Sequence, residues 1–314
     1  WALQNPVLYT AACSGVSAAL DAAMQISDYC DWQKQYAATD AAGATEKFWQ
    51  DRYSDVPEPL ELPTRTTRPP LQTFNGETLR IPIDSDIYKG IKKTGAKNGC
   101  TLSTTLLAAF KILLARLSGQ SDIVVGISLA GQSLVNGDRL VGHCVNMLPM
   151  RSHIDGDSSF GDIAQAENRA MLDTHEYQNY TFGQLLTQIK VPRDPSRTPL
   201  VSAEFTLEPK LSDLEYAGLT VEVLADPNRY YNKDIFFNFE ASPKALSLLC
   251  EYNTDLFDAA TIEHWMHCFQ TLLQSLIDSP DAPVQTLALL DATDGQQVLE
   301  EWNDTAATYP QSSI

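Results

Sequence analysis

The sequence predicts an α/β protein with a mixed sheet and flanking helices. Three observations lead to this fold class: the order of helical and strand patterns, one helix that is apolar on nearly all sides, and two late strands that form a hairpin pattern. Helices come first, then a strand, two helices and a strand, then further helices and strands, and one last helix. A doubly wound parallel sheet would alternate strands and helices regularly, so this order favours a mixed sheet.

Composition places the 314 residues among globular proteins and narrows the classes of function. Hydrophobic residues make up 44% and charged residues 20%, an ordinary globular balance. The net charge of −18 disfavours binding to nucleic-acid phosphates, because such binding needs a positive surface. No apolar run reaches membrane-spanning length, and the six cysteines are widely spaced without a Cys-x-x-Cys pair. We therefore expect a cytoplasmic protein with reduced thiols, no membrane segment and no structural metal.

The N-terminal part is predicted to be helical. Residues 1–26 are rich in alanine and indicate a helix with an interruption. A second helix is expected to open directly afterwards, with Ser27 or Asp28 as its N-cap. Tyr29 and Trp32 are three residues apart, so they should share one face of that helix.

Periodicity and breaker residues predict the remaining elements. Five prolines between residues 57 and 70 exclude a regular helix, so this connector is either a linker or a strap along the surface. A strongly apolar helix should start at Ser103 or Thr104, and Thr181 is a plausible N-cap. The chain after Pro280 is expected to be an extended polar tail or interdomain linker. Hydrophobic patterns predict helices at 41–53, 87–98, 106–117, 160–177, 180–186 and 257–277, and strands at 78–83, 123–128, 201–207, 219–224, 234–239 and 246–252.

The stretch from Val141 to Arg151 combines features of a loop and a strand, and the rest of the chain is organised around it. Gly142 permits a close approach of the backbone. Asn146 places an amide inside an apolar run, where it must find hydrogen-bond partners. Taken alone, this pattern favours one loop and one strand with a structural Asn over a binding site.

No self-contained catalytic or metal-binding motif is found in the sequence. The five histidines form no His-x-x-x-His pattern, and there is no nucleophile elbow, phosphate loop or dinucleotide fingerprint. His264 and His267 could share a metal, but an exposed helix face is the favoured interpretation. Two pairs of aspartates lie where helices begin, which favours capping over acid–base chemistry: Asp28 with Asp31, and Asp255 with Asp258.

Six motifs, in order, resemble those of the condensation domains of nonribosomal peptide synthetases. Each alone is weak, but six in the family's order over nearly the whole chain are specific. The family motifs are Tyr-x-Asp-Tyr-Ala-x-Trp, Gly-x-Phe-Val-Asn-Thr, Gln-Asp-x-Pro-Phe-Glu and Arg-Asp-x-Ser-Arg-Asn-Pro-Leu, and the last two matches are a Tyr-Asn-Thr segment and the lead-in to an adenylation domain. The corresponding segments here are Ser27–Trp32, Val141–Arg151, Tyr177–Gly183, Arg193–Leu200, Glu251–Phe257 and Glu301–Thr305.

The resemblance implies a fold and an activity. The fold is a chloramphenicol-acetyltransferase-like lobe, the second of two that form a V around a tunnel. The activity is amide-bond formation between a carrier-bound acyl donor thioester and a carrier-bound aminoacyl acceptor. The implied partners are the donor and acceptor carrier proteins, the N-terminal lobe and a downstream adenylation domain, without nucleic acid or membrane. No cofactor is bound directly, since phosphopantetheine arms on the carriers deliver the substrates.

Two other interpretations remain open. One is a non-catalytic lobe that binds a carrier protein or packs against an adenylation domain. The other is an acyltransferase of the same fold that esterifies free small molecules, which the adenylation lead-in at Glu301–Thr305 disfavours.

The resemblance also suggests a role for individual residues. The family's His-His-x-x-x-Asp-Gly motif, which carries the base, is absent, and Trp1 fits the place just after it. We therefore expect the base upstream of Trp1 and no catalytic residue in this chain. The residues expected at the tunnel are Gly142, His143, Asn146 and Arg151, with His143 more often structural than functional. The residues expected to be structural or to lie between lobes are Asp31, Trp32, Arg193, Asp194 and Arg197, with Arg193 and Asp194 as a pair that holds the turn.

The same resemblance divides the chain and exposes departures from the family. Residues 1–45 correspond to the tail of the N-terminal lobe, 46–290 to the C-terminal lobe and 291–314 to a linker toward an adenylation domain.

His143 and Cys144 replace the usual Phe-Val neighbourhood of the family motif, and residues 179–183 lack the motif's Asp, Pro and Glu. This form is similar to condensation domains near polyketide synthase modules, which suggests a hybrid synthetase.

Overall fold

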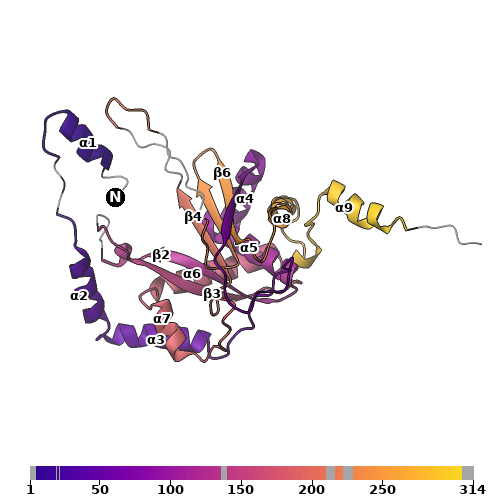
Figure 1. The fold of residues 1–314 in the computed structure, drawn as a ribbon, viewed down its shortest axis with the longest axis horizontal. Coiled ribbons are helices and arrows are strands. Elements are labelled where there is room, and N and C mark those ends of the chain that lie inside the picture. Colours follow the sequence, from indigo (N-terminus) through magenta and orange to yellow (C-terminus); the bar gives the residue numbers. More distant parts are fainter. Residues whose placement is uncertain are drawn as a thin grey trace, which may run out of the picture.

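The computed structural model describes residues 5–18, 20, 22–135, 140–209, 216–221 and 229–305. Its centre is a six-stranded sheet in the order β1-β6-β5-β4-β2-β3 (Figure 1). β4 pairs in parallel with β2 and β5, and the other neighbours are antiparallel, which confirms the predicted mixed sheet. The strands are β1 Gly76–Ile83, β2 Asp122–Ala130, β3 Val145–His153, β4 Ala203–Pro209, β5 Ile235–Ala241 and β6 Leu246–Asn253.

Helices form a layer against this sheet. α5 contacts β2 and β4, α8 contacts β1 and β6, and α6 contacts β3, while α4 packs on α5 and α8. α1 and α2 lie to one side of the sheet, and α9 lies on the opposite side (Figure 1). The helices are α1 Asn5–Cys13, α2 Ile26–Tyr36, α3 Asp40–Arg52, α4 Ser85–Lys97, α5 Leu102–Ser118, α6 Phe160–Glu176, α7 Phe182–Gln188, α8 Ala259–Asp278 and α9 Ala292–Leu299.

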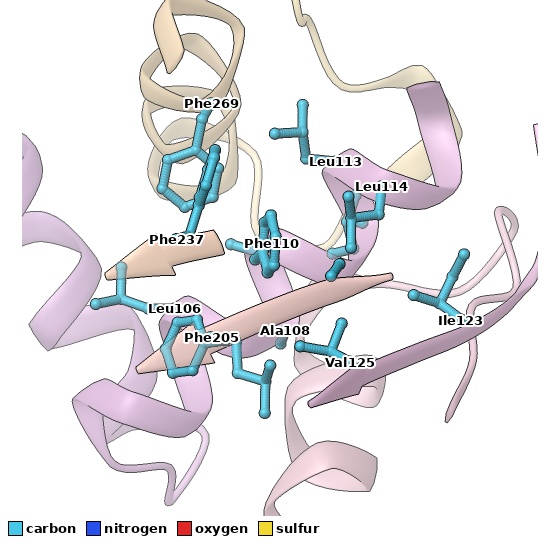
Figure 2. Packing of buried hydrophobic residues seen from close by; sticks show 14 of the residues in the cluster. Leu106, Ala108, Phe110, Leu113, Leu114, Ile123, Val125, Phe205, Phe237 and Phe269 are labelled. Carbon is cyan, nitrogen blue, oxygen red and sulfur yellow. The ribbon is translucent and has the colours of Figure 1, made fainter. Parts of the chain in front are cut away.

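The core is built around α5, as its apolar sequence predicts. Residues 104–114 of this helix are all buried. The ring of Phe110 stacks on Phe237 of β5 at 4.4 Å, and Phe269 of α8 meets Phe237 edge-on at 5.4 Å (Figure 2). Alternate strand positions face this helix layer because successive strand residues point to opposite faces. Aromatic pairs of this kind contribute beyond their buried area.

One charged pair lies inside this core. Lys111 of α5 and Glu167 of α6 are 0% and 1% exposed, and their Nζ and Oε2 atoms are 2.8 Å apart. The ammonium group also donates to Ser152 Oγ at 2.7 Å, and burial lowers the pKa of Lys111. The pair joins two helices and β3, and neither charge is left without a partner.

Several helix starts differ from the prediction. α2 begins at Ile26 after Gln25, and Asp28 accepts a hydrogen bond from the Gln25 backbone rather than acting as the N-cap. α5 begins at Leu102, one or two residues earlier than expected, because the side chain of Thr101 caps it. The predicted cap of α7 is confirmed, since Thr181 Oγ1 accepts from Gln184 N at 3.1 Å. In α5 and α7 the threonine oxygen that accepts from the first turn decides which residue opens the helix.

The predicted interruption near Gly15 is confirmed, but the prediction that the helix continues to residue 26 was wrong. α1 ends at Cys13, and Gly15 adopts a left-handed φ of +66°. The described residues between Ser14 and Gln25 form no regular element. Low charge and many alanines favour a helix but do not specify where it stops, whereas a glycine in this conformation does.

The proline-rich connector is a strap on the surface and not a linker. Leu60 and Leu62 are 6% and 4% exposed, so they belong to the core. The Arg65 backbone N–H donates to the carbonyl of Leu256 at 3.0 Å. Arg68 makes two hydrogen bonds to the carboxylate of Asp234, where β5 begins. These contacts hold the strap along its length.

The chain after Pro280 is more ordered than the predicted extended tail. Val284 is 1% exposed and belongs to a 3-10 turn, Val284–Thr286. Arg116 Nη1 donates to the carbonyls of Val284 and Leu287, both at 3.0 Å. α9 then follows as an exposed helix. Of the strand predicted at 219–224, residues 219–221 form only an isolated bridge between Leu219 and Tyr216, and the rest lies outside the described residues.

The hairpin prediction is confirmed. β5 and β6 are antiparallel, with Ile235 opposite Tyr252. The backbone N–H of Ser242 donates to the carbonyl of Ala245 and closes the turn between them.

In the described part of the chain, no single helix is long and apolar enough to cross a membrane, and only the bent pair α4 and α5 meets that criterion jointly.

Candidate functional site

Three motif segments that are far apart in the sequence meet at one cleft. α2 forms one wall, residues 143–146 form the floor, and residues 178–181 before α7 form the other wall. They enclose a cavity of about 300 Å³. A second cavity of about 700 Å³ adjoins it between α2, α3 and the start of α7, and both are lined by Cys30, Gln33, Asn179, Tyr180 and Thr181. Cavities of these sizes suit part or all of a small ligand.

One face of α2 lines the smaller cavity. Ile26, Tyr29, Cys30 and Gln33 are spaced by three and four residues, so they share that face. Tyr29 is 6% exposed, and its ring stacks on Trp32 at 5.7 Å, which confirms the predicted aromatic pair. Trp32 packs against a small buried cluster that Tyr29 forms with Leu140 and Cys144, as expected of a structural residue.

Asn146 fixes the floor of the cleft. Its Nδ2 donates to the carbonyls of Gln178 at 3.0 Å and Tyr180 at 2.7 Å. The half-buried amide therefore has the partners that the sequence required, and they come from another motif. The stretch is a loop up to Cys144 and strand β3 from Val145, as its pattern predicted.

Gly142 and His143 lie at the rim of the same cleft. A Cβ atom on Gly142 would come within 2.9 Å of Ile26 Cδ1, so the backbone approaches α2 closely at this residue. His143 lines the smaller cavity and is exposed. The structure therefore brings together three of the four expected tunnel residues, Gly142, His143 and Asn146. Trp1, after which the sequence placed the missing motif, lies outside the described residues.

Arg151, the fourth expected tunnel residue, lies away from this cleft. Its Nη2 is 2.6 Å from Asp55 Oδ2 and 2.7 Å from Asp122 Oδ2. It also donates to the Asp55 carbonyl at 2.9 Å, and its hydrogen bonds lower the pKa of the Asp55 carboxyl. These contacts join β3, β2 and the chain after α3. Arg151 instead borders a separate cavity of about 260 Å³ with Arg52 and His153.

The charged turn is held by a different pair from the one predicted. Asp194 Oδ2 is 2.9 Å from Arg197 Nε, and Arg197 also meets Glu61 at 2.8 Å. The Asp194 carboxylate accepts from the backbone and hydroxyl of Ser196 at 2.8 and 2.6 Å. These hydrogen bonds, and then Arg197, lower the pKa of Asp194. Arg193 is exposed, and the described residues offer it no ion pair.

The remaining polar candidates lie outside the cleft. Asp31 forms an exposed ion pair with Lys34 at 2.9 Å, which contributes little to stability. His264 Nδ1 lies 3.7 Å from Asp294 Oδ2, and its Nε2 lies 3.5 Å from Cys268 Sγ. Within the described ranges, no group of three or more histidines, cysteines or acidic residues is arranged to hold a metal.

Sequence reasoning missed two features of the site. Tyr180 is 6% exposed and lines both cavities, and its hydroxyl has no hydrogen-bond partner among the described residues. Burial, with a smaller effect of Glu46, raises its pKa. Leu200 adopts a φ of +62° at the end of the charged turn, a strained conformation for this residue type. Tyr180 stands at the variable position of its motif, and the motif Leu at position 200 carries no sign of its backbone conformation, so the sequence gives no signal for either feature.

Comparison with known proteins finds one matching family model and similar curated proteins. The family model described as the condensation domain matches residues 6–299. Surfactin synthase subunit 1 of Bacillus subtilis (strain 168) is 30% identical over 288 residues, which are 91% of this chain and 8% of that protein. The chain therefore spans less than a tenth of this curated relative.

Solved structures share the fold. The X-domain in complex with OxyB from teicoplanin biosynthesis aligns with a TM-score of 0.79 and 18% identity over 91% of this chain and 65% of that chain. The first condensation domain of the calcium-dependent antibiotic synthetase aligns with a TM-score of 0.78 and 17% identity, over 92% of this chain and 63% of that chain. The chain thus covers about two thirds of each.

Proposed function

The chain belongs to the condensation-domain family, and from this premise we propose that it acts in a nonribosomal peptide synthetase as an amide-forming acyltransferase. In the proposed reaction the amine of a carrier-bound aminoacyl acceptor attacks the thioester carbonyl of a carrier-bound acyl donor. A C–N bond forms, the C–S bond breaks, and the pantetheine thiol of the donor carrier leaves. The family match over residues 6–299 supports this proposal.

The observation that carries the proposal is the meeting of three family motifs at one cleft. Gly142, His143 and Asn146 lie opposite α2, and Asn146 holds the segment before α7 in place. A rigid floor of this kind can orient two substrates, and orientation alone supplies a large part of the rate in reactions between two bound partners. We propose that these residues position the carrier-borne substrates.

We place the general base outside the 314 residues. The sequence holds five histidines and no adjacent pair, so the family's His-His-x-x-x-Asp-Gly motif is not present. A positioned base contributes a factor of about 100 to 10,000. We propose that an N-terminal lobe supplies it, and that residues 1–45 belong to that lobe, 46–290 to the C-terminal lobe and 291–314 to a connection toward an adenylation domain.

The proposed partners and surroundings follow from the same role. Donor and acceptor carrier proteins would bring their substrates on phosphopantetheine arms, and no resident cofactor is required. A polyketide acyl chain is a candidate donor, given the Gly-His-Cys-Val-Asn sequence of the floor. All six cysteines are free thiols, which suits the reducing cytoplasm.

A second candidate function is a non-catalytic lobe that binds another protein. Two observations favour it: no adjacent histidines occur in the sequence, and the X-domain with the same fold was solved in complex with OxyB. In this case the cleft would recognise a partner without forming a bond.

The deciding experiment is product mass in a reaction of donor-loaded and acceptor-loaded carrier proteins. The chain is tested alone and with the N-terminal lobe added. Amide product only with the added lobe supports a condensation enzyme with an external base. Product from the chain alone contradicts the external base and directs attention to His143. No product in either reaction, together with measurable binding of a carrier protein, supports the second candidate.

A further inference from the structure

We propose that Cys30 and Cys144 form a redox-sensitive dithiol that can become a disulfide across the cleft, tying α2 to the start of β3. The inference concerns a modification site and does not rest on the proposed function. It starts from the observation that both thiols line the same cavity of about 300 Å³.

The two cysteines lie on neighbouring stretches of chain that line one cavity. Ile26 and Cys30 are one helical turn apart on the face of α2 that lines the cavity. Opposite them, Gly142 approaches Ile26 so closely that a Cβ atom would lie 2.9 Å from Ile26 Cδ1. Cys144 follows two residues later, directly before β3, and lines the same cavity as Cys30. Cys144 is therefore carried toward Cys30.

Contacts around Cys144 hold it in this place. Its backbone carbonyl accepts from Gly131 N at 2.8 Å. Its side chain belongs to a small cluster with Tyr29, the residue before Cys30. The approach is so tight that a Cβ atom on Gly131 would lie 2.3 Å from the Tyr29 hydroxyl oxygen and 2.6 Å from the Cys144 carbonyl oxygen.

Both cysteines are departures from the motifs that the chain otherwise resembles. Cys30 stands where Tyr-x-Asp-Tyr-Ala-x-Trp has Ala, and Cys144 stands where Gly-x-Phe-Val-Asn-Thr has Phe. A buried thiol that acts as a small hydrophobic group would account for Cys144 alone. It does not account for a second, exposed cysteine on the facing wall.

The environments of the two thiols assign them different roles. Cys30 is exposed, whereas Cys144 is 5% exposed. Burial, and then the nearby Cys30, raises the pKa of Cys144. Because the thiolate is the nucleophile, Cys30 reacts first with an external disulfide and Cys144 acts as the resolving thiol.

The chemistry is thiol–disulfide exchange with a low-molecular-weight disulfide. The Cys30 thiolate attacks one sulfur of the small disulfide, forms a mixed disulfide and releases one small thiolate. The Cys144 thiolate then attacks the Cys30 sulfur and expels the second small thiolate. Two protein thiols are oxidised to one disulfide, and one small disulfide is reduced to two thiols that take up the two protons. A disulfide needs the two Cα atoms within about 7 Å, so the reaction also measures how closely the walls approach.

The test uses the full chain with oxidised glutathione as the probe. We expect the cross-link to remove two of the six free thiols and two hydrogen atoms from the protein mass, and the exposed Cys13 to carry at most a mixed disulfide with glutathione. Peptide mapping should find one fragment that links Cys30 to Cys144, and dithiothreitol should restore all six thiols. Cys13→Ala removes another exposed thiol and should leave the cross-link unchanged.

The matched control is Cys30→Ala, which places the family's residue at an exposed position and should leave the fold, and hence the circular dichroism spectrum, unchanged. This variant should form no cross-link and keep all of its thiols apart from mixed disulfides. The proposal is overturned by a stable glutathione adduct at Cys30 with Cys144 still free, by a Cys13–Cys30 cross-link, or by loss of two thiols in Cys30→Ala.

Discussion

A single amide connects two of the motifs. Asn146 donates both hydrogens of its side-chain amide to carbonyls of the segment that leads into α7. Those carbonyls belong to irregular backbone, which has no helix or sheet partner at these atoms, so the side chain takes the place of a ladder bond. The residue acts on the site through the position of Tyr180 and its neighbours.

Replacing Asn146 by Ala should lower the free energy of unfolding by about 1–3 kcal/mol, because two part-buried carbonyls lose their donor. Urea denaturation measures the change. Asn179→Ala is the matched control, since this amide lies in the same cleft and has no hydrogen bond among the described residues. Equal losses in the two variants would contradict the assigned role of Asn146.

The Asp194 carboxylate should make stability depend on pH. Hydrogen bonds from Ser196 and the charge of Arg197 lower its pKa in the folded state. A lowered pKa gives stability that is fully present above the unfolded value of about 3.9 and is lost as the pH falls through the folded value. The difference in urea midpoint between the natural chain and Asp194→Asn should therefore be largest near neutral pH and shrink below about pH 4. A difference that stays constant from pH 6 to pH 3 would refute this assignment.

At the scale of elements, the strap shows how an irregular segment becomes part of the core. Its prolines remove backbone donors and keep it extended. Alternate residues then point to the same side, and Leu60 and Leu62 both reach the core. The Arg68 guanidinium pairs with the Asp234 carboxylate, and these side chains are 13% and 6% exposed. This pair fixes the far end of the strap.

Truncation of a strap leucine tests this role. Leu62→Ala should cost about 2–5 kcal/mol, because it removes a buried side chain and leaves a cavity. Leu71→Ala, just beyond the strap at 66% exposure, should change stability by less than about 0.5 kcal/mol. Chemical denaturation of both variants gives the comparison. If Leu62→Ala were as mild as Leu71→Ala, the segment would be a linker after all.

At the scale of the whole molecule, the buried hydrophobic residues form two clusters, one large and one small. The main core lies between the sheet and the helix layer of α4, α5, α6 and α8. A smaller cluster of Tyr29, Leu140 and Cys144 attaches α2 to the cleft. α1 contributes to neither cluster. The opposite face of the sheet carries polar residues such as Glu204, Asn238 and Glu240 at alternate positions.

Limited proteolysis should follow this division. With a protease of broad specificity, the first cut is expected between α1 and α2, where the described residues have no regular structure, and the product should keep α2 and everything after it up to α9. The strap should resist cleavage despite its irregular backbone, because its side chains and hydrogen bonds hold it. Mass spectrometry of early products locates the cuts. A first cut within residues 57–70 would contradict the anchored strap.

The sequence by itself determined the fold class, the β5–β6 hairpin, the buried helix α5 and the ordered motifs, because these depend on periodicity and local residue types. The N-cap residues Gln25 and Thr101 were missed, since several residues nearby can cap a helix and the sequence does not show which one does. Tertiary structure alone decided that Asn146 binds Gln178 and Tyr180, that Asp194 pairs with Arg197, and that Arg151 leaves the cleft to join Asp55 and Asp122. The contacts of Asn146 and Arg151 join side chains to groups that are far away along the chain. Asp194 and Arg197 are only three residues apart, and the conformation of the turn decided that they pair with each other. The placement of Cys30 and Cys144 on one cavity was also decided by the tertiary structure, because it exists only once α2 has packed beside the start of β3.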